Sequence, residues 1–221
     1  MSLSGDEAVV AAFDFDGTLT TQDTLPAFIR FTHGLRRMLR GLLRYAPSLL
    51  LMRLGLYPNG KAKEEVFSHF YRGVSHEQFM QWGRQFAGVA MTMLNGRMVE
   101  MLHRHQAEGH TVCVVTASID EWVRPVCDRL GIRVLLATHI EVSPDGNLTG
   151  RFLSPNCYGS EKVERLLEAF PHRATYKLYA YGNGRGDHEL LALADEAFLV
   201  SGRRHYFLFL YTKFFAKRNK G

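Results

Sequence analysis

Two aspartates near the N-terminus are the residues of this chain whose types and spacing suggest chemistry most clearly. Asp14 and Asp16 follow the apolar run Ala8–Phe13 and are succeeded by Gly17 and Thr18. Gly17 allows the backbone to turn sharply after a strand. Two carboxylates and several free backbone N–H groups are therefore expected at the carboxyl edge of a sheet, where open α/β sheets bind ligands. A pair of N-capping aspartates in an ordinary turn is the alternative interpretation.

Three further polar groups are expected to adjoin later strands or helices. Thr116 and Ser118 follow an apolar run and precede a helix, whose first amides can bind a phosphate. Lys162 falls in the first turn of a predicted helix, where a cation is unfavourable unless it meets an anion. Asn183 and Asp187 lie in a glycine-rich turn and offer the oxygen ligands that Mg²⁺ accepts. Each group alone also fits a structural role: a helix cap, a solvated lysine or a flexible turn.

The elements that must position these groups alternate between strands and helices in the second part of the chain. Periodicity and turn residues predict strands and helices in this order: helix Met98–Glu108, strand Thr111–Val115, helix 118–130, strand Val134–Ala137, hairpin Ile140–Phe152 around Asp145-Gly146, helix Ser160–Phe170, strand Tyr176–Tyr181, helix Asp187–Ala194 and strand Ala197–Val200. Such alternation implies a parallel sheet with right-handed crossovers.

A helical segment is predicted between the first strand and this alternating part. Leu35, Leu39 and Leu42 recur at helical spacing, Gly34 and Pro47 interrupt the pattern, and no strand signal is present. The sequence therefore predicts an α/β core domain of residues 1-24 and 94-221. A helical cap domain of residues 25-93 is predicted to be inserted into it.

The order of these motifs resembles that of the haloacid dehalogenase superfamily. The resemblance rests on Asp14-Phe15-Asp16-Gly17-Thr18, a hydroxyl after a strand, a lysine, and Gly182-Asn183-x-x-x-Asp187. The helical insert after the first motif is similar to that of the phosphoserine phosphatase-like subfamily, called subfamily IB. Dehalogenases of the superfamily lack the second aspartate, so Asp16 favours a phosphohydrolase. The resemblance implies a Rossmann-like three-layer α/β core with a helical-bundle cap.

The resemblance also implies a Mg²⁺-dependent phosphomonoester hydrolase and a role for each motif residue. Asp14 would attack phosphorus and form an aspartyl-phosphate, and Asp16 would protonate the leaving group and then activate water. The implied residues are Asp14, Asp16 and Lys162 for catalysis, Thr18, Thr116, Ala117 and Lys162 for phosphate, and Asp14, the Asp16 backbone carbonyl, Asn183 and Asp187 for Mg²⁺.

Two positions depart from the pattern of the superfamily. Asn183 occupies a position where aspartate is more frequent, and Gly184 one where serine is frequent. An amide oxygen can still bind Mg²⁺, but the site loses one negative charge. We therefore expect weaker metal binding with activity retained.

Length and composition fit a soluble globular protein in a reducing compartment. The chain has 221 residues, 46% of them hydrophobic and 22% charged, and three cysteines without a Cys-x-x-Cys motif. No basic leader precedes Asp14, and no stretch reaches the eighteen apolar residues of a membrane-spanning helix. These features predict a cytoplasmic protein. Peripheral contact with the inner face of the membrane is a further expectation, which rests on the distribution of charge.

The net charge of +5 is unevenly distributed. Eight basic residues and no acid lie between Asp23 and Glu64, and six basic residues and no acid follow Glu196. Leu35–Arg44 has the pattern of a basic amphipathic helix, which suits an anionic membrane surface, and Arg203–Phe215 alternates aromatic residues with cations. A solvated arginine face covering the cap's own leucine core is the preferred interpretation of the first pattern.

The cap is expected to select the substrate through Asp23, Arg36 and Arg40. Asp23 stands where phosphoserine phosphatases place an acid that meets the substrate amine, whereas the rest of the cap is basic and leucine-rich. Cys157–Val163 resembles the lysine motif of phosphatidylglycerophosphatase C-like members. A small phosphomonoester, a lipid phosphate and phosphoserine therefore stay open as substrates. No recognition motif supports specific nucleic-acid binding. A non-enzymatic binding protein is disfavoured because four principal site residues are present: Asp14, Asp16, Thr116 and Lys162.

Overall fold

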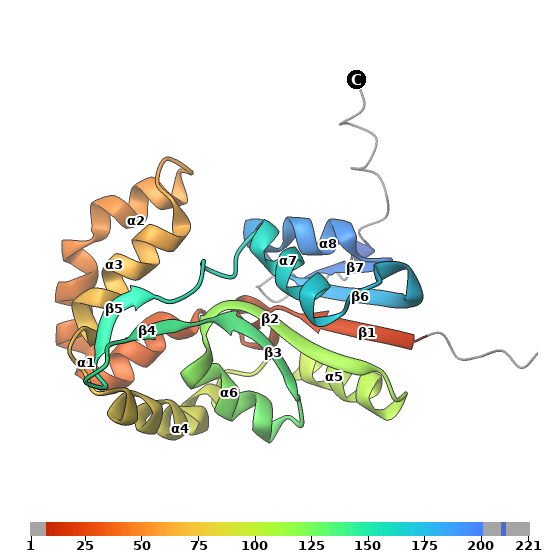
Figure 1. The fold of residues 1–221 in the computed structure, drawn as a ribbon, viewed down its shortest axis with the longest axis horizontal. Helices are drawn as coiled ribbons and strands as arrows, with labels where there is room; N and C mark the ends of the chain where they lie inside the picture. The colour runs from red at the N-terminus through yellow and green to blue at the C-terminus, as the bar shows by residue number, and fades with distance from the viewer. Residues whose placement is uncertain (1–7, 201–208, 211–221) are drawn as a thin grey trace, which may run out of the picture.

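A computed structural model describes residues 8–200 and the pair 209–210. Its centre is a six-stranded sheet in the order β3-β2-β1-β6-β7-β8 (Figure 1). The strands are β1 Ala8–Phe13, β2 Thr111–Ile119, β3 Val134–Thr138, β6 Tyr176–Gly182, β7 Glu196–Leu199 and β8 Phe209–Leu210. All pairs are parallel except β7 with β8. Because β1 lies between β2 and β6, the residues that follow these three strands meet at one edge.

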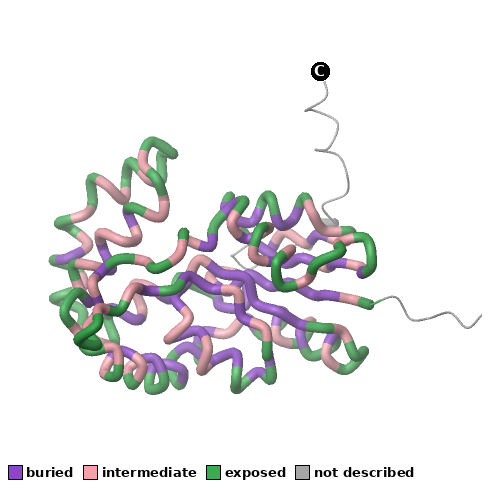
Figure 2. The backbone as a smooth tube through the Cα atoms, viewed as in Figure 1, coloured by how far each residue is buried: buried purple, intermediate pink, exposed green. Residues whose placement is uncertain are grey.

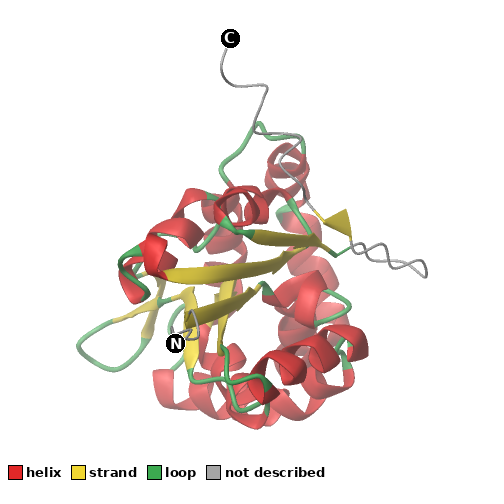
Figure 3. Ribbon diagram, turned by 90° about the vertical axis from the view of Figure 1, so that its right-hand side faces the viewer, coloured by secondary structure: helices red, strands yellow, loops and turns green. Residues whose placement is uncertain are grey.

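Helices cover both faces of the sheet, as the view in Figure 3 shows. They are α5 Gly96–Ala107 and α6 Asp120–Arg129 on one face, and α7 Ser160–Ala169 and α8 His188–Leu193 on the other. Alternate residues of β1 point to opposite faces: Ala11 and Phe13 join the core on the α5 and α6 side, and Val10 and Ala12 join the core on the α7 and α8 side. The predicted three-layer α/β architecture is confirmed.

A helical segment follows β1, as predicted. It consists of α1 Thr24–Arg44, α2 Ala46–Arg53, α3 Asn59–Tyr71 and α4 His76–Thr92. The predicted interruptions lie where expected: Gly34, with φ of +77°, breaks the course of α1, and Pro47 lies in the first turn of α2. The Ser75 hydroxyl accepts a hydrogen bond from the Gln78 amide and caps α4.

The predicted hairpin is present as β4 Ile140–Val142 and β5 Leu148–Phe152. It pairs with the helical segment: the Phe152 amide donates to Glu64 Oε2 at 2.8 Å, and the Gly73 amide donates to the Leu148 carbonyl at 2.8 Å. The sequence assigned this hairpin to the core part of the chain. The division into a core of residues 1-24 and 94-221 and a cap of residues 25-93 stays a prediction.

Aromatic rings join the helical segment to the layer of α6. Phe28 of α1 stacks on Trp122 of α6 with ring centroids 4.8 Å apart, and Phe79 of α4 meets the same indole. Gly83 of α4 allows a close approach, because a Cβ there would lie 2.1 Å from the Glu121 carbonyl oxygen. These contacts form one continuous buried core, seen as the purple interior of Figure 2, which holds the helical segment beside the edge where β1 ends.

One predicted helix cap is wrong. The sequence predicts Ser118 as the N-cap of the following helix, but β2 continues to Ile119 and α6 begins at Asp120. The Ser118 hydroxyl donates instead to the Asp16 carboxylate, a charged acceptor that lies beside it at the neighbouring strand end.

Two expectations concern membranes. Along residues 8–200, no helix combines the length and the apolar character that crossing a bilayer requires. The aromatic and cationic stretch Arg203–Phe215 lies outside the described residues, apart from the short strand β8.

Candidate active site

Asp14 is held in place by the turn that follows β1. Its amide donates to the Tyr181 carbonyl of β6 at 2.8 Å, and the single helical turn Phe15–Leu19 then redirects the chain. Gly17, with φ of +75°, supplies the left-handed conformation that this turn needs. The Thr18 hydroxyl donates to Asp14 Oδ2 at 3.0 Å. One carboxylate oxygen of the buried Asp14 is thereby oriented by its own turn.

Lys162 binds the other oxygen of Asp14. Its side chain is 2% exposed, and Nζ lies 2.7 Å from Asp14 Oδ1 and 2.6 Å from Asp187 Oδ1. Burial favours the neutral amine, but the two carboxylates outweigh it, so the Lys162 pKa is raised above its ordinary value. As its position in the first turn of α7 predicts, Lys162 meets anions. They are two carboxylates of the protein itself, Asp14 and Asp187.

The buried carboxylates leave the site with an excess of negative charge. Burial raises the pKa of Asp14 to about 7, Lys162 acts against this rise, and the neighbouring Asp187 adds to it. Asp16 is half-buried beside them. Three acids and one buried lysine thus share this edge of the sheet, a balance that favours binding of a further cation.

The loop after β6 is organised by Asp187. Its Oδ2 accepts hydrogen bonds from the amides of Asn183 at 2.9 Å and Gly184 at 3.0 Å, while its Oδ1 binds Lys162. The Asn183 side chain reaches back over the first motif, where Nδ2 donates to the Asp16 carbonyl oxygen at 2.9 Å. Both oxygens of Asp187 are therefore engaged, Oδ2 by the loop amides and Oδ1 by Lys162.

A small hard cation fits the donor atoms at this edge. The Asp14 carboxylate, the Asp16 carbonyl and the Asn183 side-chain amide are the oxygen-bearing groups that Mg²⁺ prefers. The amide and the carbonyl already lie 2.9 Å apart, and a turn of the amide about its terminal bond brings its oxygen to the same place. Asp187 would support such a site indirectly, because it already holds Lys162 and the loop amides.

The Asp16 side chain is oriented from two other elements. Its Oδ1 accepts hydrogen bonds from the Thr24 amide at 2.8 Å and the Thr24 hydroxyl at 2.7 Å, and Ser118 donates to Oδ2. Burial, and after it the nearby Asp23 carboxylate, raises the pKa of Asp16 above its usual range. A raised pKa suits a carboxyl group that must donate a proton.

A cavity of about 160 Å³ opens beside these groups. It is lined by Asp14, Asp16, Asp23, Lys63, Thr116, Ala117, Tyr158, Lys162, Asn183, Gly184, Arg185, Gly186 and Asp187. Eight of the predicted catalytic, phosphate-binding, metal-binding and substrate residues are in this set. The cavity joins the ends of β1, β2 and β6 to the start of α7 and to Asp23 and Lys63 of the helical segment.

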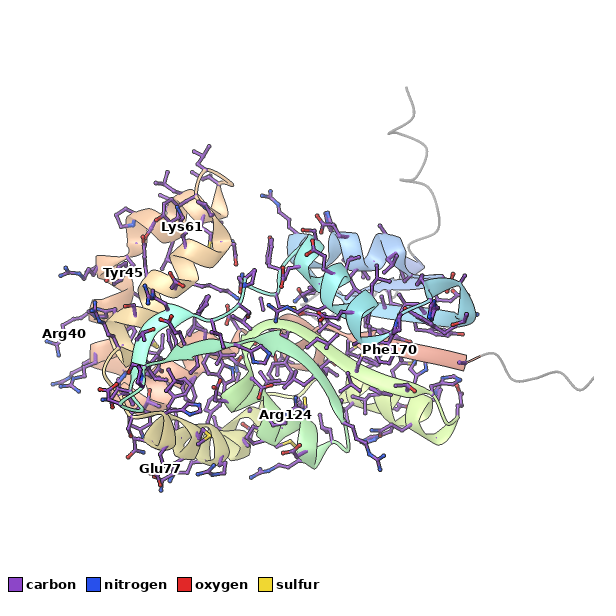
Figure 4. All side chains as sticks on the ribbon, in the orientation of Figure 1. Arg40, Tyr45, Lys61, Glu77, Arg124 and Phe170 are labelled. Carbon is purple, nitrogen blue, oxygen red and sulfur yellow. The ribbon has the colours of Figure 1, made fainter. Side chains whose placement is uncertain are left out.

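Three predicted site residues lie elsewhere. Thr18 is bonded to Asp14 and does not line the cavity, so its contact with phosphate stays a prediction. Arg36 and Arg40 were expected to meet the substrate, but they are absent from the cavity wall, and Arg40 lines a separate cavity with Arg44. Figure 4 shows Arg40 at the outer side of the helical segment. The break at Gly34 carries the second half of α1 away from Asp14, which helical spacing alone does not reveal.

Several residues of the cavity were missed from the sequence. Lys63 and Arg185 bring two cations to it, and Tyr158 packs over Gly186, where a Cβ would lie 2.5 Å from the ring. Arg185 stands inside the glycine-rich turn, so its proximity had a signal in the sequence. Lys63 had none beyond its place in a basic run, because its approach depends on how α3 packs.

We expect Gly17→Ala to weaken both the fold and the Mg²⁺-dependent turnover that the sequence predicts. A non-glycine residue at this φ costs about 1–2 kcal/mol, and the new Cβ would lie 1.8 Å from Asn183 Nδ2, so the amide must move. The melting temperature should fall by about 2–8 °C. The Mg²⁺ concentration for half-maximal activity should rise about ten-fold or more.

Gly146→Ala is the matched control for this variant. Gly146 also has a positive φ, of +81°, but a Cβ there meets nothing within 4 Å. This variant should show the backbone cost without the change in Mg²⁺ dependence. If the two variants showed equal Mg²⁺ dependence, the close approach of Gly17 to the Asn183 side chain would not be what positions that side chain for Mg²⁺.

The chain is similar to several known proteins. The model of the haloacid dehalogenase-like hydrolase family matches residues 11–192. Protein CicA of Caulobacter vibrioides is 36% identical over 193 residues, covering 87% of this chain and 86% of that protein. A histidinol-phosphatase of Neisseria meningitidis is 26% identical over 204 residues, covering 87% and 90%. A solved phospho-aspartyl intermediate analogue of phosphoserine phosphatase shares the fold, with a TM-score of 0.63, 17% identity and coverage of 88% and 87%.

The family match agrees with the geometry of the site. Its range contains every motif residue around the cavity, from Asp14 to Asp187. The relative at 36% identity covers most of the chain, so the similarity extends beyond the fold. The chain therefore belongs to the haloacid dehalogenase-like hydrolase family, as the order of its motifs predicts.

Proposed function

We propose that this hydrolase cleaves phosphomonoesters through an aspartyl-phosphate on Asp14, with Mg²⁺ bound beside it. The observation that carries the proposal is the buried contact of Lys162 with Asp14 at the wall of the cavity that Thr116 and Ala117 also line. A carboxylate with a positioned cation and nearby hydrogen-bond donors suits nucleophilic attack on phosphorus. The similar histidinol-phosphatase and the phosphoserine phosphatase of the same fold support this reaction class.

Five residues of the cavity have a defined part in the proposed reaction. An Asp14 oxygen forms a bond to phosphorus, and the ester oxygen leaves with the electrons of the broken P–O bond. Asp16, oriented by Thr24 and Ser118, gives that oxygen a proton. It afterwards takes a proton from a water that attacks phosphorus, and the bond between phosphorus and the Asp14 oxygen breaks, so that inorganic phosphate leaves and the Asp14 carboxylate is regenerated. Lys162 offsets the charge that gathers on Asp14 and the phosphoryl group, and Thr116 and the Ala117 amide donate to phosphoryl oxygens.

Mg²⁺ would be held by the Asp14 carboxylate, the Asp16 carbonyl oxygen and the Asn183 amide oxygen. When bound, it supplies the positive charge that three acids and a phosphoryl group at one place require. The protein's own cations here are Lys162, Lys63 and Arg185, of which only Lys162 contacts the buried acids.

The test of this proposal is phosphate release from a panel of phosphomonoesters. Phosphoserine, histidinol phosphate, sugar phosphates, nucleotides and phosphatidylglycerophosphate would each be incubated with the protein in Mg²⁺ and in EDTA. We expect Mg²⁺-dependent release from at least one compound. Absence of release from all of them would overturn the proposal.

We expect Asn183→Asp to tighten Mg²⁺ binding. The change restores a carboxylate next to the Asp16 carbonyl, and the number of charged ligands tunes cation affinity. The Mg²⁺ concentration for half-maximal activity should fall about ten-fold, and the metal-free protein should melt at a lower temperature because a fourth acid joins the site. An unchanged or higher Mg²⁺ requirement would contradict Asn183 as a ligand, and Asn183→Ala supplies the opposite control.

A phosphorylated lipid at an anionic membrane surface is a second candidate substrate. Among the described residues, eight of the twelve exposed large hydrophobic side chains fall within residues 31–56. They are Phe31, Leu35, Leu39, Leu43, Leu50, Leu51, Leu54 and Leu56. Helix α2 has no buried residue, and Figure 2 shows that the outer end of the helical segment is mostly exposed. No acid lies between Asp23 and Glu64, so arginines alone accompany these leucines.

This combination favours a bilayer interface over a solvated helix face. Apolar side chains enter the boundary between headgroups and acyl chains while neighbouring arginines bind anionic headgroups. A cavity of about 570 Å³, lined partly by Phe31, Met38 and Met93, shares Asp23 with the catalytic cavity. It would take an apolar substituent next to the phosphate.

Vesicle co-sedimentation tests this second candidate. The protein should bind phosphatidylglycerol vesicles at low salt, bind phosphatidylcholine vesicles less, and lose binding as salt rises. The double variant Leu39→Glu, Leu43→Glu should abolish binding, whereas Arg129→Gln, which changes an exposed arginine at the end of α6, should leave it unchanged. Wild-type protein that stays in the supernatant at low salt would exclude the membrane role without affecting the phosphatase proposal.

A further inference from the structure

A second group of metal-ligating side chains lies outside the catalytic cavity, at the junction of α5 and β2. His105 and Glu108 stand at the end of α5, and His110 directly precedes β2. The catalytic cavity involves Thr116 and Ala117, further along the same strand. We propose that His105, Glu108 and His110 bind a divalent transition-metal cation such as Zn²⁺.

The three side chains converge because of the turn between α5 and β2. Gly109 has a φ of +77°, which ends the helix in a left-handed turn, and the His110 amide donates to the His105 carbonyl at 3.0 Å. One ligand atom from each side chain lies within 4.8 Å of the other two. The spacing His-x-x-Glu-x-His therefore acts as a compact ligand set only because Gly109 folds the chain back.

The contact between the two imidazoles is the central observation. His105 Nδ1 lies 2.7 Å from His110 Nδ1, and Glu108 Oε2 lies 3.5 Å from His110 Nδ1. Two facing ring nitrogens hold one shared proton, which a cation can replace by binding both lone pairs. Two ligands of a tetrahedral Zn²⁺ at about 2.0–2.1 Å are separated by about 3.3 Å. Binding therefore needs the two ring nitrogens to part by about 0.6 Å, and His110, the less buried of the two histidines, is the one that can shift.

His105 is positioned in the manner of a metal ligand. The residue is 4% exposed. Its ring packs edge-on to Tyr179 with centroids 4.9 Å apart, and Nε2 lies 2.9 Å from the Tyr181 hydroxyl. When Nε2–H donates to that hydroxyl, Nδ1 is left with a lone pair directed at His110. Ligating histidines in metal sites characteristically use their second nitrogen in this way.

The donor set selects the class of metal. Two imidazole nitrogens and one carboxylate suit Zn²⁺ and its neighbours in the first transition row, whereas Mg²⁺ and Ca²⁺ prefer oxygen ligands. The Glu108 side chain is 53% exposed, so solvent reaches the cluster and water can complete the coordination. The cluster is therefore chemically distinct from the oxygen site beside Asp14.

The experiment is a Zn²⁺ titration of the full chain without a histidine tag, against a chromogenic chelator and in excess Mg²⁺. Full occupancy should be one Zn²⁺ per chain, and Co²⁺ should give the visible absorption of a low-coordinate nitrogen and oxygen site. His110→Ala and Glu108→Gln should each weaken Zn²⁺ binding about ten-fold or more. The partly exposed ligands are chosen because substitution of the buried His105 is more prone to disturb folding.

Two controls separate this site from other sources of Zn²⁺ binding. His103→Ala removes an exposed histidine of the same helix and should bind Zn²⁺ like the wild type. Asp14→Asn should also retain Zn²⁺ binding, because its change lies in the catalytic cavity. The proposal would be overturned if His110→Ala bound Zn²⁺ as tightly as the wild type, or if the wild type did not bind one Zn²⁺ per chain. Either result holds whatever the outcome of the phosphatase assays.

Discussion

Asp14→Asn should lower turnover of the best phosphomonoester substrate by about 10⁴-fold or more, the scale of losing a catalytic nucleophile. Asparagine has nearly the same shape as aspartate but lacks the anionic oxygen that must bond to phosphorus. Its amide oxygen can still accept the hydrogen bond from Lys162. Initial rates of phosphate release, measured in Mg²⁺ on the same preparation, give the comparison with wild-type protein.

The structure also predicts that this loss is not caused by unfolding. Burial already disfavours the charged form of Asp14, which raises its pKa, so a neutral side chain there should cost about 1 kcal/mol or less. Asp145→Asn, an exposed carboxylate in the hairpin turn, is the matched control and should keep full activity. Equal rates for Asp14→Asn and wild type would mean that a contaminant produces the turnover.

Lys162→Met should remove both activity and much of the stability. Methionine keeps a similar length but leaves Asp14 and Asp187 buried without their counter-charge. Breaking a buried charge pair on one side costs about 3–5 kcal/mol, and denaturant unfolding would measure it. Turnover should fall by at least about 100-fold, because a charge that stabilises the transition state is lost.

A double variant separates the two effects of Lys162. Lys162→Met with Asp187→Asn removes the cation and one of its two acids, so part of the lost stability should return while turnover stays low. Added Mg²⁺ should also stabilise Lys162→Met more than the wild type, because the uncompensated carboxylates attract it more strongly. A Lys162→Met protein as stable as the wild type would show that the lysine does not balance these acids.

The fold and the centre of the site could be predicted because their signals are local. The apolar run before Asp14, Asp16 and Gly17 predicts a strand, and Gly17 predicts the turn that follows it. Parallel strands that alternate with helices place their carboxyl ends at one edge of the sheet. The contact between Lys162 and Asp14 joins residues far apart in the sequence. Topology brings it about, because α7 begins beside the strand that carries Asp14.

The details that could not be predicted depend on competition between distant groups. Ser118 has the sequence pattern of a helix cap, but the Asp16 carboxylate from the neighbouring strand end is a stronger partner for its hydroxyl. Arg36 and Arg40 follow the helical period of α1, but Gly34 breaks the direction of that helix. Lys63 reaches the cavity because of how α3 packs, and residue spacing in the sequence does not predict that packing.

The helical segment completes the site from outside the sheet. Thr24 holds the Asp16 carboxylate, and its hydroxyl also accepts a hydrogen bond from the Trp122 indole at 3.2 Å. The packing of α1 on α6 is thereby linked to the orientation of the proposed acid. This link explains why the residues just before and at the start of α1 belong to the site, whereas the residues of α1 after Gly34 do not.

Trapping the phosphorylated residue tests the central claim most directly. The protein would be mixed with its best substrate and Mg²⁺, quenched in acid and reduced with borohydride, which converts an acyl phosphate of aspartate to homoserine. Peptide mass spectrometry should then find the change at Asp14, only when substrate is present, and not in Asp14→Asn. Steady turnover with Asp14 unmodified, or with the change at Asp16 or Asp187 instead, would contradict the proposed reaction.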